Sequence, residues 1–177
     1  MPSGRTHDAI TFLLAVPSAM AGFAFTHSIA SAAVICASFL FGGLMFGPDL
    51  DTVSVQHSRW SVFRSIWLPY RAFFKHRSRF SHGLIFGALI RVVYFLGVIT
   101  ILVIGGVMIW NAVKGGRAPD VQDVTRLWKQ VGDYSRAHFG QNILLLVFLG
   151  TWLGAASHTF TDVAGTFIKT GRVGKML

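Results

Sequence analysis

The sequence predicts an all-α integral membrane protein: a bundle of about four transmembrane helices with an additional amphipathic helix in the membrane interface. Of its 177 residues, 53% are hydrophobic and only 13% are charged, whereas about a quarter of the residues in a soluble domain are charged. The hydrophobic residues are concentrated in four runs, each near the ~20 residues that cross a bilayer as a helix. We therefore expect residues 1–177 to form a single membrane domain.

The four runs define the expected spans. They cover residues 9–25, 29–46, 83–110 and 142–161. A short turn at 26–28 joins the first two spans into a hairpin, and a polar connection at 111–141 joins the last two. Because Arg91 interrupts the third run, we expect the first two turns of that span to be buried in the bundle and the part beyond Arg91 to contact lipid.

A cleaved signal peptide is the alternative for the first run. Arg5, an apolar stretch and the small residues at 19–21 resemble the three regions of such a signal. Cleavage there would remove His7 and Asp8. A membrane span is favoured, because acidic residues are unusual in the basic segment of a signal and because the apolar run continues beyond this site.

Basic residues predict the orientation in the membrane. With four antiparallel spans, both termini and the loop at 48–82 share one face. The Lys and Arg residues of that face are Arg5, Arg59, Arg64, Arg71, Lys75, Arg77, Arg79, Lys169, Arg172 and Lys175. Those of the other face are Lys114, Arg117, Arg126, Lys129 and Arg136. Cytoplasmic loops are enriched in Lys and Arg, so both termini are expected to be cytoplasmic, in an inner, plasma or thylakoid-type membrane.

Residues 56–75 are predicted to form the interfacial amphipathic helix. The aromatic residues Trp60, Phe63, Trp67, Tyr70 and Phe74 recur at steps of three and four, while Arg64, Arg71 and Lys75 fall on another stripe. This pattern is typical of a helix with aromatic rings at the acyl boundary and cations at the headgroups. Pro69 is expected to kink or divide the helix. Packing of the aromatic stripe on the bundle itself explains the pattern equally well.

Eight His and Asp residues fall near the ends of the spans, all on the predicted cytoplasmic face. They are His7, Asp8, Asp49, Asp51, His76, His82, His158 and Asp162. His158 and Asp162 are four positions apart, on one face of a helix, and Asp49 and Asp51 could both point inward from a tight extended turn after Pro48. A cap or a turn explains each residue taken alone. Their shared face instead predicts that they converge on a metal site.

The types of ligand restrict the metal. Imidazole and carboxylate favour zinc, with manganese, iron or nickel as alternatives. The single cysteine, Cys36, lies in an apolar run, which excludes a cysteine zinc site. Eight ligands exceed the three or four of one catalytic zinc, so a dinuclear centre bridged by an Asp would use them. Such a pair of ions is suited to activating water and clamping a phosphoryl or acyl centre.

Within this set, Asp49 and Asp51 are the expected catalytic carboxylates. Arg77 and Arg79 lie between two of the candidate histidines and could hold the oxygens of a substrate phosphate. Binding of lipid headgroups is the alternative role for these two arginines. The remaining histidines, His27, His57 and His138, are expected to be interfacial or solvated.

Four segments of the chain resemble a known family. They are Pro-Ser-Gly-Arg-Thr-His-Asp at 2–8, Phe-Gly-Gly-Leu-Met-Phe-Gly-Pro-Asp-Leu-Asp at 41–51, His-Arg-Ser-Arg-Phe-Ser-His-Gly at 76–83 and Ser-His-Thr-Phe-Thr-Asp at 157–162. Together they resemble small bacterial, notably cyanobacterial, metal-binding membrane proteins related to the YdjM-like membrane-bound metal-dependent hydrolases. The resemblance covers nearly all of the chain except 111–140, and the segment that begins at His76 has one extra residue relative to the YdjM-like pattern. It implies a metal site and a hydrolase whose substrate is not established.

Two functions remain open at this point. A metal-dependent hydrolase would act on an amphiphilic, lipid-like phosphate or ester at the cytoplasmic face. A non-catalytic metal-binding or assembly protein would use the same cluster as a sensor or stabiliser. A lipid phosphatase of the phosphatidic acid phosphatase type would need an Arg-Pro dipeptide and a Pro-Ser-Gly-His segment, and the sequence has neither. Membrane lipids are the expected partners and nucleic acid is not, because the basic residues flank the spans.

Overall fold

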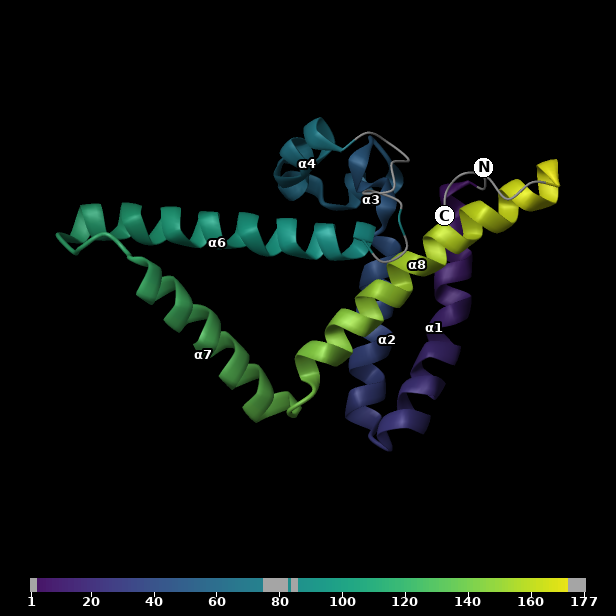
Figure 1. Cartoon of the computed structure of the whole chain (residues 1–177), viewed down its shortest axis with the longest axis horizontal. Helices are drawn as coiled ribbons and strands as arrows, with labels where there is room; N and C mark the ends of the chain where they lie inside the picture. The colour runs from purple at the N-terminus through teal and green to yellow at the C-terminus, as the bar shows by residue number, and fades with distance from the viewer. Residues whose placement is uncertain (1–2, 75–82, 84–85, 172–177) are drawn as a thin grey trace. The chain divides into compact units, whose positions relative to one another are not determined.

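A computed structural model gives the structure of the chain and describes residues 3–74, 83 and 86–171 (Figure 1). Within these ranges the chain forms helices and no strand, as the sequence predicts. Four of the described helices are long and apolar enough to cross a membrane. They are α1 (Gly4–Thr26), the stretch Ile29–Asp51 that contains α2 (Ile29–Leu44), α6 (Phe86–Lys114) and α8 (Ile143–Thr170), in which the apolar part is Ile143–Ile168.

Several helix ends lie outside the predicted spans. The hydroxyl of Ser3 accepts a hydrogen bond from the backbone N–H of Thr6, which caps α1 and lets it begin at Gly4. At the other end of the chain, α8 continues to Thr170. A search for apolar runs misses such polar helix ends. The consequence for the site is that His7 lies inside the first turns of α1.

The chain divides into two compact units, residues 1–91 with 145–177 and residues 92–144. The first unit holds α1, α2, the first turns of α6 and most of α8. Arg91, at its boundary, is 2% exposed, and Gly87 and Ala88 are buried in the same turns of α6. None of the most apolar stretch of α6 is buried. This agrees with the expectation that the first turns of the third span are buried and the rest is not.

Small residues bring α2 and α8 into close contact. A Cβ atom on Gly154 would lie 2.0 Å from the carbonyl oxygen of Phe39, and one on Gly42 would lie 2.1 Å from that of Thr151. A Cβ atom on Gly150, one helical turn before Gly154, would lie 2.7 Å from the carbonyl oxygen of Ile35 in α2. In membranes, small residues at this spacing let two helix backbones approach. The contact fixes the part of α8 that leads directly into His158.

The segment after α2 folds as several short helices, whereas the sequence predicts an amphipathic helix at 56–75 that Pro69 kinks or divides. They are η1 (Pro48–Asp51), α3 (Val55–Arg59), η2 (Ser61–Trp67) and α4 (Leu68–Phe73). A positive φ of 49° at Ser61 ends the helical path of α3. Pro69 lies in the first turn of α4, where a missing backbone N–H costs nothing, and it therefore divides the segment as expected.

The aromatic stripe of this segment packs mainly on the protein itself. Trp67 and Tyr70 are fully buried, and the ring of Trp67 meets that of Phe46 edge-on at 5.5 Å. The indole N–H of Trp60 donates to the carbonyl oxygen of Met45 at 2.9 Å. These contacts favour the second of the two explanations left open by the sequence, and they hold the segment against the end of α2.

The second unit contains an amphipathic helix, α7 (Val121–Phe139), inside the connection that the sequence showed only as polar. Asp120 caps it in a capping box with Asp123, and the backbone N–H of Asp123 lowers the pKa of Asp120 by donating to its carboxylate. The indole N–H of Trp128 donates to the hydroxyl of Thr100 in α6.

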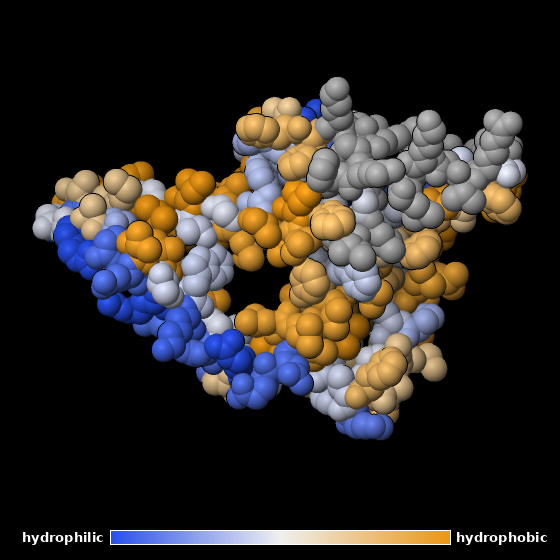
Figure 2. Space-filling model, viewed as in Figure 1, coloured by the Kyte–Doolittle hydropathy of each residue, from blue (hydrophilic) through white to orange (hydrophobic). Residues whose placement is uncertain are grey.

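On the face drawn in Figure 2, hydrophilic residues run along α7, whereas the visible parts of α1 and α8 are mostly hydrophobic.

Candidate metal centre

Three side chains from two of the long apolar helices, α1 and α8, meet in the first unit. One potential ligand atom from each of His7, His158 and Asp162 lies within 4.8 Å of the others. The Nε2 atom of His7 is 3.2 Å from Oδ1 of Asp162, and that of His158 is 3.9 Å from Oδ2. All three residues are buried, with exposed fractions of 6%, 3% and 2%. Helix α1 therefore supplies one candidate ligand and α8 supplies two, one turn apart.

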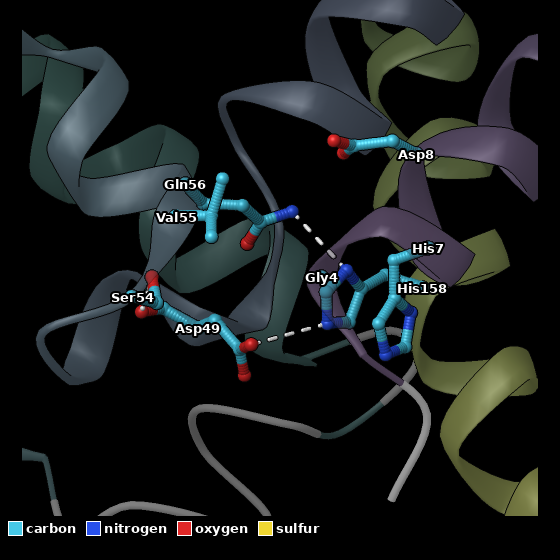
Figure 3. Close-up of a pocket in the computed structure, with 8 residues that line it drawn as sticks. All are labelled: Gly4, His7, Asp8, Asp49, Ser54, Val55, Gln56 and His158. Carbon is cyan, nitrogen blue, oxygen red and sulfur yellow. Dashed lines mark hydrogen bonds and ion pairs between the residues drawn. The ribbon is translucent and has the colours of Figure 1, made fainter.

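The two imidazole rings are stacked. Their centroids are 3.7 Å apart and their planes differ by 8°, and Figure 3 shows the rings of His7 and His158 side by side. The Nε2 atom of His7 lies nearest to Asp162, whereas that of His158 lies between Asp49, at 3.3 Å, and Asp162, at 3.9 Å. Two nitrogens and a carboxylate are thus directed at one small volume.

A second carboxylate reaches this cluster from η1. Oδ2 of Asp49 lies 3.3 Å from Nε2 of His158, and the Asp49 side chain is 25% exposed. It lines a pocket of about 210 Å³ that is also bordered by His7, His158 and residues of α3. Figure 3 shows the Asp49 carboxylate pointing across this pocket toward His158. The buried cluster is therefore accessible from the pocket, through Asp49.

Gln56, in α3, holds the far side of the His158 ring. Its amide nitrogen lies 3.2 Å from Nδ1 of His158 and donates to the carbonyl oxygen of Gly43 at 2.7 Å. The Gln56 side chain is 4% exposed. Second-sphere partners of this kind set the tautomer and the orientation of a metal-binding histidine. No sequence pattern marks Gln56, because a single glutamine in a short helix has no ligand signature.

The buried polar atoms of the cluster fit a metal ion. Within the described part of the chain, Nδ1 of His7, Nε2 of His158 and both oxygens of Asp162 have no hydrogen bond of good geometry. The close approaches of His7 to Asp162 and of His158 to Asp49 are ion-pair contacts only if the imidazoles are protonated. Burying an ionised carboxylate without donors costs several kcal/mol. A divalent cation would remove this penalty, and two imidazoles with one carboxylate form a known zinc ligand set. The residues present therefore fit a metal ion.

Comparison with protein families agrees with this geometry. Residues 2–172 match the model of the family described as "Uncharacterized metal-binding protein (DUF2227)". The chain belongs to this metal-binding family. Searches of the curated proteins and of the solved structures each found no match. Metal binding is thus a property of the DUF2227 family, and in this member the group His7, His158 and Asp162 could hold the ion.

Two of the other carboxylates predicted as ligands have different neighbours in this DUF2227 protein. Asp8 lines the pocket but forms an ion pair with Nη2 of Arg59 at 2.5 Å, while Nη1 of Arg59 donates to the carbonyl oxygen of Leu44. The Asp8–Arg59 pair ties α1 to α3. In Figure 3 the Asp8 side chain lies apart from the two stacked rings.

Asp51 is more deeply buried than Asp49. Pro48–Asp51 forms a 3₁₀ helix instead of the expected extended turn, and in it Asp51 is 6% exposed whereas the Asp49 side chain is 25% exposed. Burial raises the pKa of Tyr70; the hydrogen-bonded guanidinium of Arg91 opposes this rise and the charge of Asp51 adds to it. Asp51 therefore lies in the electrostatic field of the Tyr70–Arg91 pair.

The remaining predicted residues fall into two groups. His76, Arg77, Arg79 and His82 lie outside the described residues. Of the histidines expected to be interfacial or solvated, His27 and His138 are exposed, but His57 is only 5% exposed. Burial lowers the pKa of His57, and the charges of Arg71 and Arg64 lower it further. The expectation for His57 was wrong, because the short helices fold its ring inward.

Proposed function

We propose that this protein is a metal-dependent hydrolase of the membrane, acting on an amphiphilic, lipid-like phosphate or ester at the cytoplasmic face. One observation carries the proposal: the His7–His158–Asp162 cluster borders an open pocket that also contains Asp49. Structural zinc sites are closed by four protein ligands, whereas catalytic sites have three and keep one position open. Three ligands beside a pocket match the catalytic arrangement.

The residues around the cluster have distinct roles in this proposal. A bound divalent ion, with zinc as the first choice and manganese, iron or nickel as alternatives, would polarise a phosphoryl or acyl oxygen. Asp49, partly exposed and 3.3 Å from His158, is placed to accept a proton from the attacking water or to bridge to a second ion. Gln56 orients His158. Arg77 and Arg79 remain the candidates for holding a substrate phosphate.

Two further observations support a membrane hydrolase. The ligands come from helices long and apolar enough to span a bilayer, so the cluster lies where an amphiphile can reach it. The sequence also resembles cyanobacterial members of this group and the YdjM-like metal-dependent hydrolases. That resemblance extends to the segment at 157–162, which contains two of the three clustered ligands.

An assay in mixed micelles tests the proposal. Metal-loaded protein would be offered amphiphilic phosphomonoesters, phosphodiesters and acyl esters, and we expect turnover of one class. Asp49→Asn should lower kcat by about 10²–10⁴-fold, the usual contribution of a general base. Asp133→Asn, which changes an exposed carboxylate of α7, serves as the matched control. The absence of turnover in every class, with the metal still bound, would refute the hydrolase.

A non-catalytic role is the second candidate. It is favoured by one observation: the cluster joins α1 to α8, so a metal ion there would fasten the first described span to the last. In that case metal removal would strongly lower the unfolding temperature. Asp49→Asn would change neither the metal content nor the unfolding temperature of the metal-bound protein. The same protein would then serve in metal sensing or in the assembly of a partner.

A further inference from the structure

A second hollow, of about 490 Å³, lies between α1, α2 and α8 in the first unit. Its walls include Ile10, Leu14, Phe39, Leu153, Phe160 and Ala164. The two polar side chains in its lining, Ser157 and Thr161, donate their hydroxyl protons to carbonyl oxygens of α8 itself, at 2.7 and 2.8 Å. The walls therefore offer a ligand almost only hydrocarbon contacts.

The groove and the metal cluster use neighbouring positions of the same two helices. Ser157 and Thr161 directly precede His158 and Asp162 in α8, and Ile10 lies one turn after His7 in α1. Along α1 the lining runs from Ile10 to Leu14, and Leu14 lies about 10 Å along the helix from His7, given a rise of 1.5 Å per residue. Leu14 lies farther into the apolar run of α1 than His7 does. The lining of the groove on α1 thus runs toward the middle of the span.

We propose that this groove binds one hydrocarbon chain of an amphiphile whose polar end lies at His7, His158 and Asp162. The inference rests on the proposed function and names its substrate class: a long-chain phosphate or ester. The polar pocket, at about 210 Å³, is smaller than the ~300–1,000 Å³ of pockets that enclose a drug-sized ligand. It accommodates a polar headgroup only, whereas the groove falls within that range.

The exposure of the groove walls explains how a chain would enter. Leu153 is 44% exposed and Phe160 is 59% exposed, on a helix apolar enough to lie in a bilayer. A chain can move sideways from the lipid into the groove without passing through water, so no hydrophobic free energy is lost on entry. Only the polar headgroup changes its surroundings, when it moves from the headgroup layer to the cluster.

Photolabelling of the full chain in lipid vesicles tests the groove. The probes are two long-chain phosphates with a diazirine in the chain, one with a straight acyl-type chain and one with an isoprenoid chain. We expect labels on Leu14, Leu153 or Phe160, suppressed by an unlabelled long-chain phosphate but not by inorganic phosphate. The probe that labels more strongly identifies the type of chain.

Variants separate groove binding from general contact with lipid. Ala164 is exposed and lines the groove, so Ala164→Phe should fill it and lower labelling at these positions at least about fivefold, with metal content unchanged. Ala164→Met is a smaller replacement if the Phe variant does not fold. Ala21→Phe, at an exposed position of α1 away from the groove, should have no effect.

Two results distinguish the failure of this inference from that of the hydrolase. Labels spread evenly over the exposed faces of α6 and α8, and insensitive to Ala164→Phe, would overturn the groove even if the protein hydrolyses a substrate. Specific labelling of the groove without turnover in the micelle assay would support the groove and refute the hydrolase.

Discussion

The side-chain amide of Gln56 lies 3.2 Å from Nδ1 of His158, although the two residues are 102 positions apart in the chain. The same nitrogen donates to the carbonyl oxygen of Gly43. An amide N–H that faces Nδ1 donates to the lone pair of Nδ1. The proton of the neutral imidazole is then on Nε2. Coordination through Nε2 requires the opposite tautomer, with Nδ1–H facing an acceptor. Metal binding should therefore be accompanied by rotation of the Gln56 amide.

Replacement of Gln56 tests this coupling. Gln56→Leu cannot accept a hydrogen bond from Nδ1–H, so we expect metal affinity to fall by about 10–100-fold, the usual effect of losing a second-sphere partner. Gln56→Glu offers an acceptor oxygen without rotation and should retain most of the affinity. Competition with a chromogenic chelator measures both. Equal losses in the two variants would show that Gln56 matters only for packing.

Single replacements of the clustered ligands should remove the metal. His7→Ala, His158→Ala and Asp162→Asn each take away one of three ligands, and we expect the metal content of purified protein, measured by elemental analysis, to fall to less than about a tenth. His27→Ala and His138→Ala change exposed histidines and are the controls. A control that loses metal as readily as the three variants would contradict the assignment.

The glycine contact between α2 and α8 should be sensitive to one methyl group. Because a Cβ atom on Gly154 would lie 2.0 Å from the carbonyl oxygen of Phe39, Gly154→Ala must separate the two helices, and overpacking of this kind costs about 1–3 kcal/mol. Thermal unfolding in detergent would show the loss, together with weaker metal binding. Gly105→Ala, with no atom within 4 Å of the added Cβ, should be neutral or slightly stabilising.

The buried ring of His57 should make stability depend on pH. Its pKa is lowered in the folded chain, first by burial and then by Arg71 and Arg64, whereas an unfolded His titrates near 6.5. The unfolded chain thus binds more protons as the pH falls below about 6.5, and stability declines until the pH passes the folded pKa. His57→Asn should flatten this decline in chelator-treated protein between about pH 7 and pH 5. An unchanged slope, equal to that of His138→Asn, would contradict the prediction.

Cysteine labelling should establish the orientation. In a Cys36→Ala background, we expect Gly116→Cys to react with an impermeant reagent added outside the cell, and Ser58→Cys to react only after permeabilisation. Both positions are exposed. Reversed labelling would place both termini, and the metal cluster with them, on the outer side of the membrane.

The convergence of His7, His158 and Asp162 was foreseeable, because it follows from counting spans: helix ends on the same side of an antiparallel bundle come together. The partners of Asp8 and Asp51 were not. Asp8 lies at the same end of α1 as His7. Its pairing with Arg59, 51 residues away, depends on how the short helices after α2 fold back onto α1. Sequence spacing contains no information about that path.

Helix α7 was missed for a different reason. Its apolar residues, such as Val121, Val124, Leu127 and Trp128, recur at helical spacing, but polar residues between them make the average hydropathy low. A search for apolar runs passes over such a helix, whereas a search for a 3.6-residue period, starting from the cap Asp120-x-x-Asp123, would have found it.

The positions of the three ligands in the sequence determine when the cluster can form during synthesis of the chain. His7 emerges from the ribosome with the first span, but His158 and Asp162 follow only with the last span described. An ion that needs all three ligands can be captured only after α8 has packed against the rest of the first unit. Until then Asp162 is an acidic group without a counterion beside hydrocarbon, a state that quality-control proteases of the membrane could recognise. Metal capture would thus mark the chain as fully inserted.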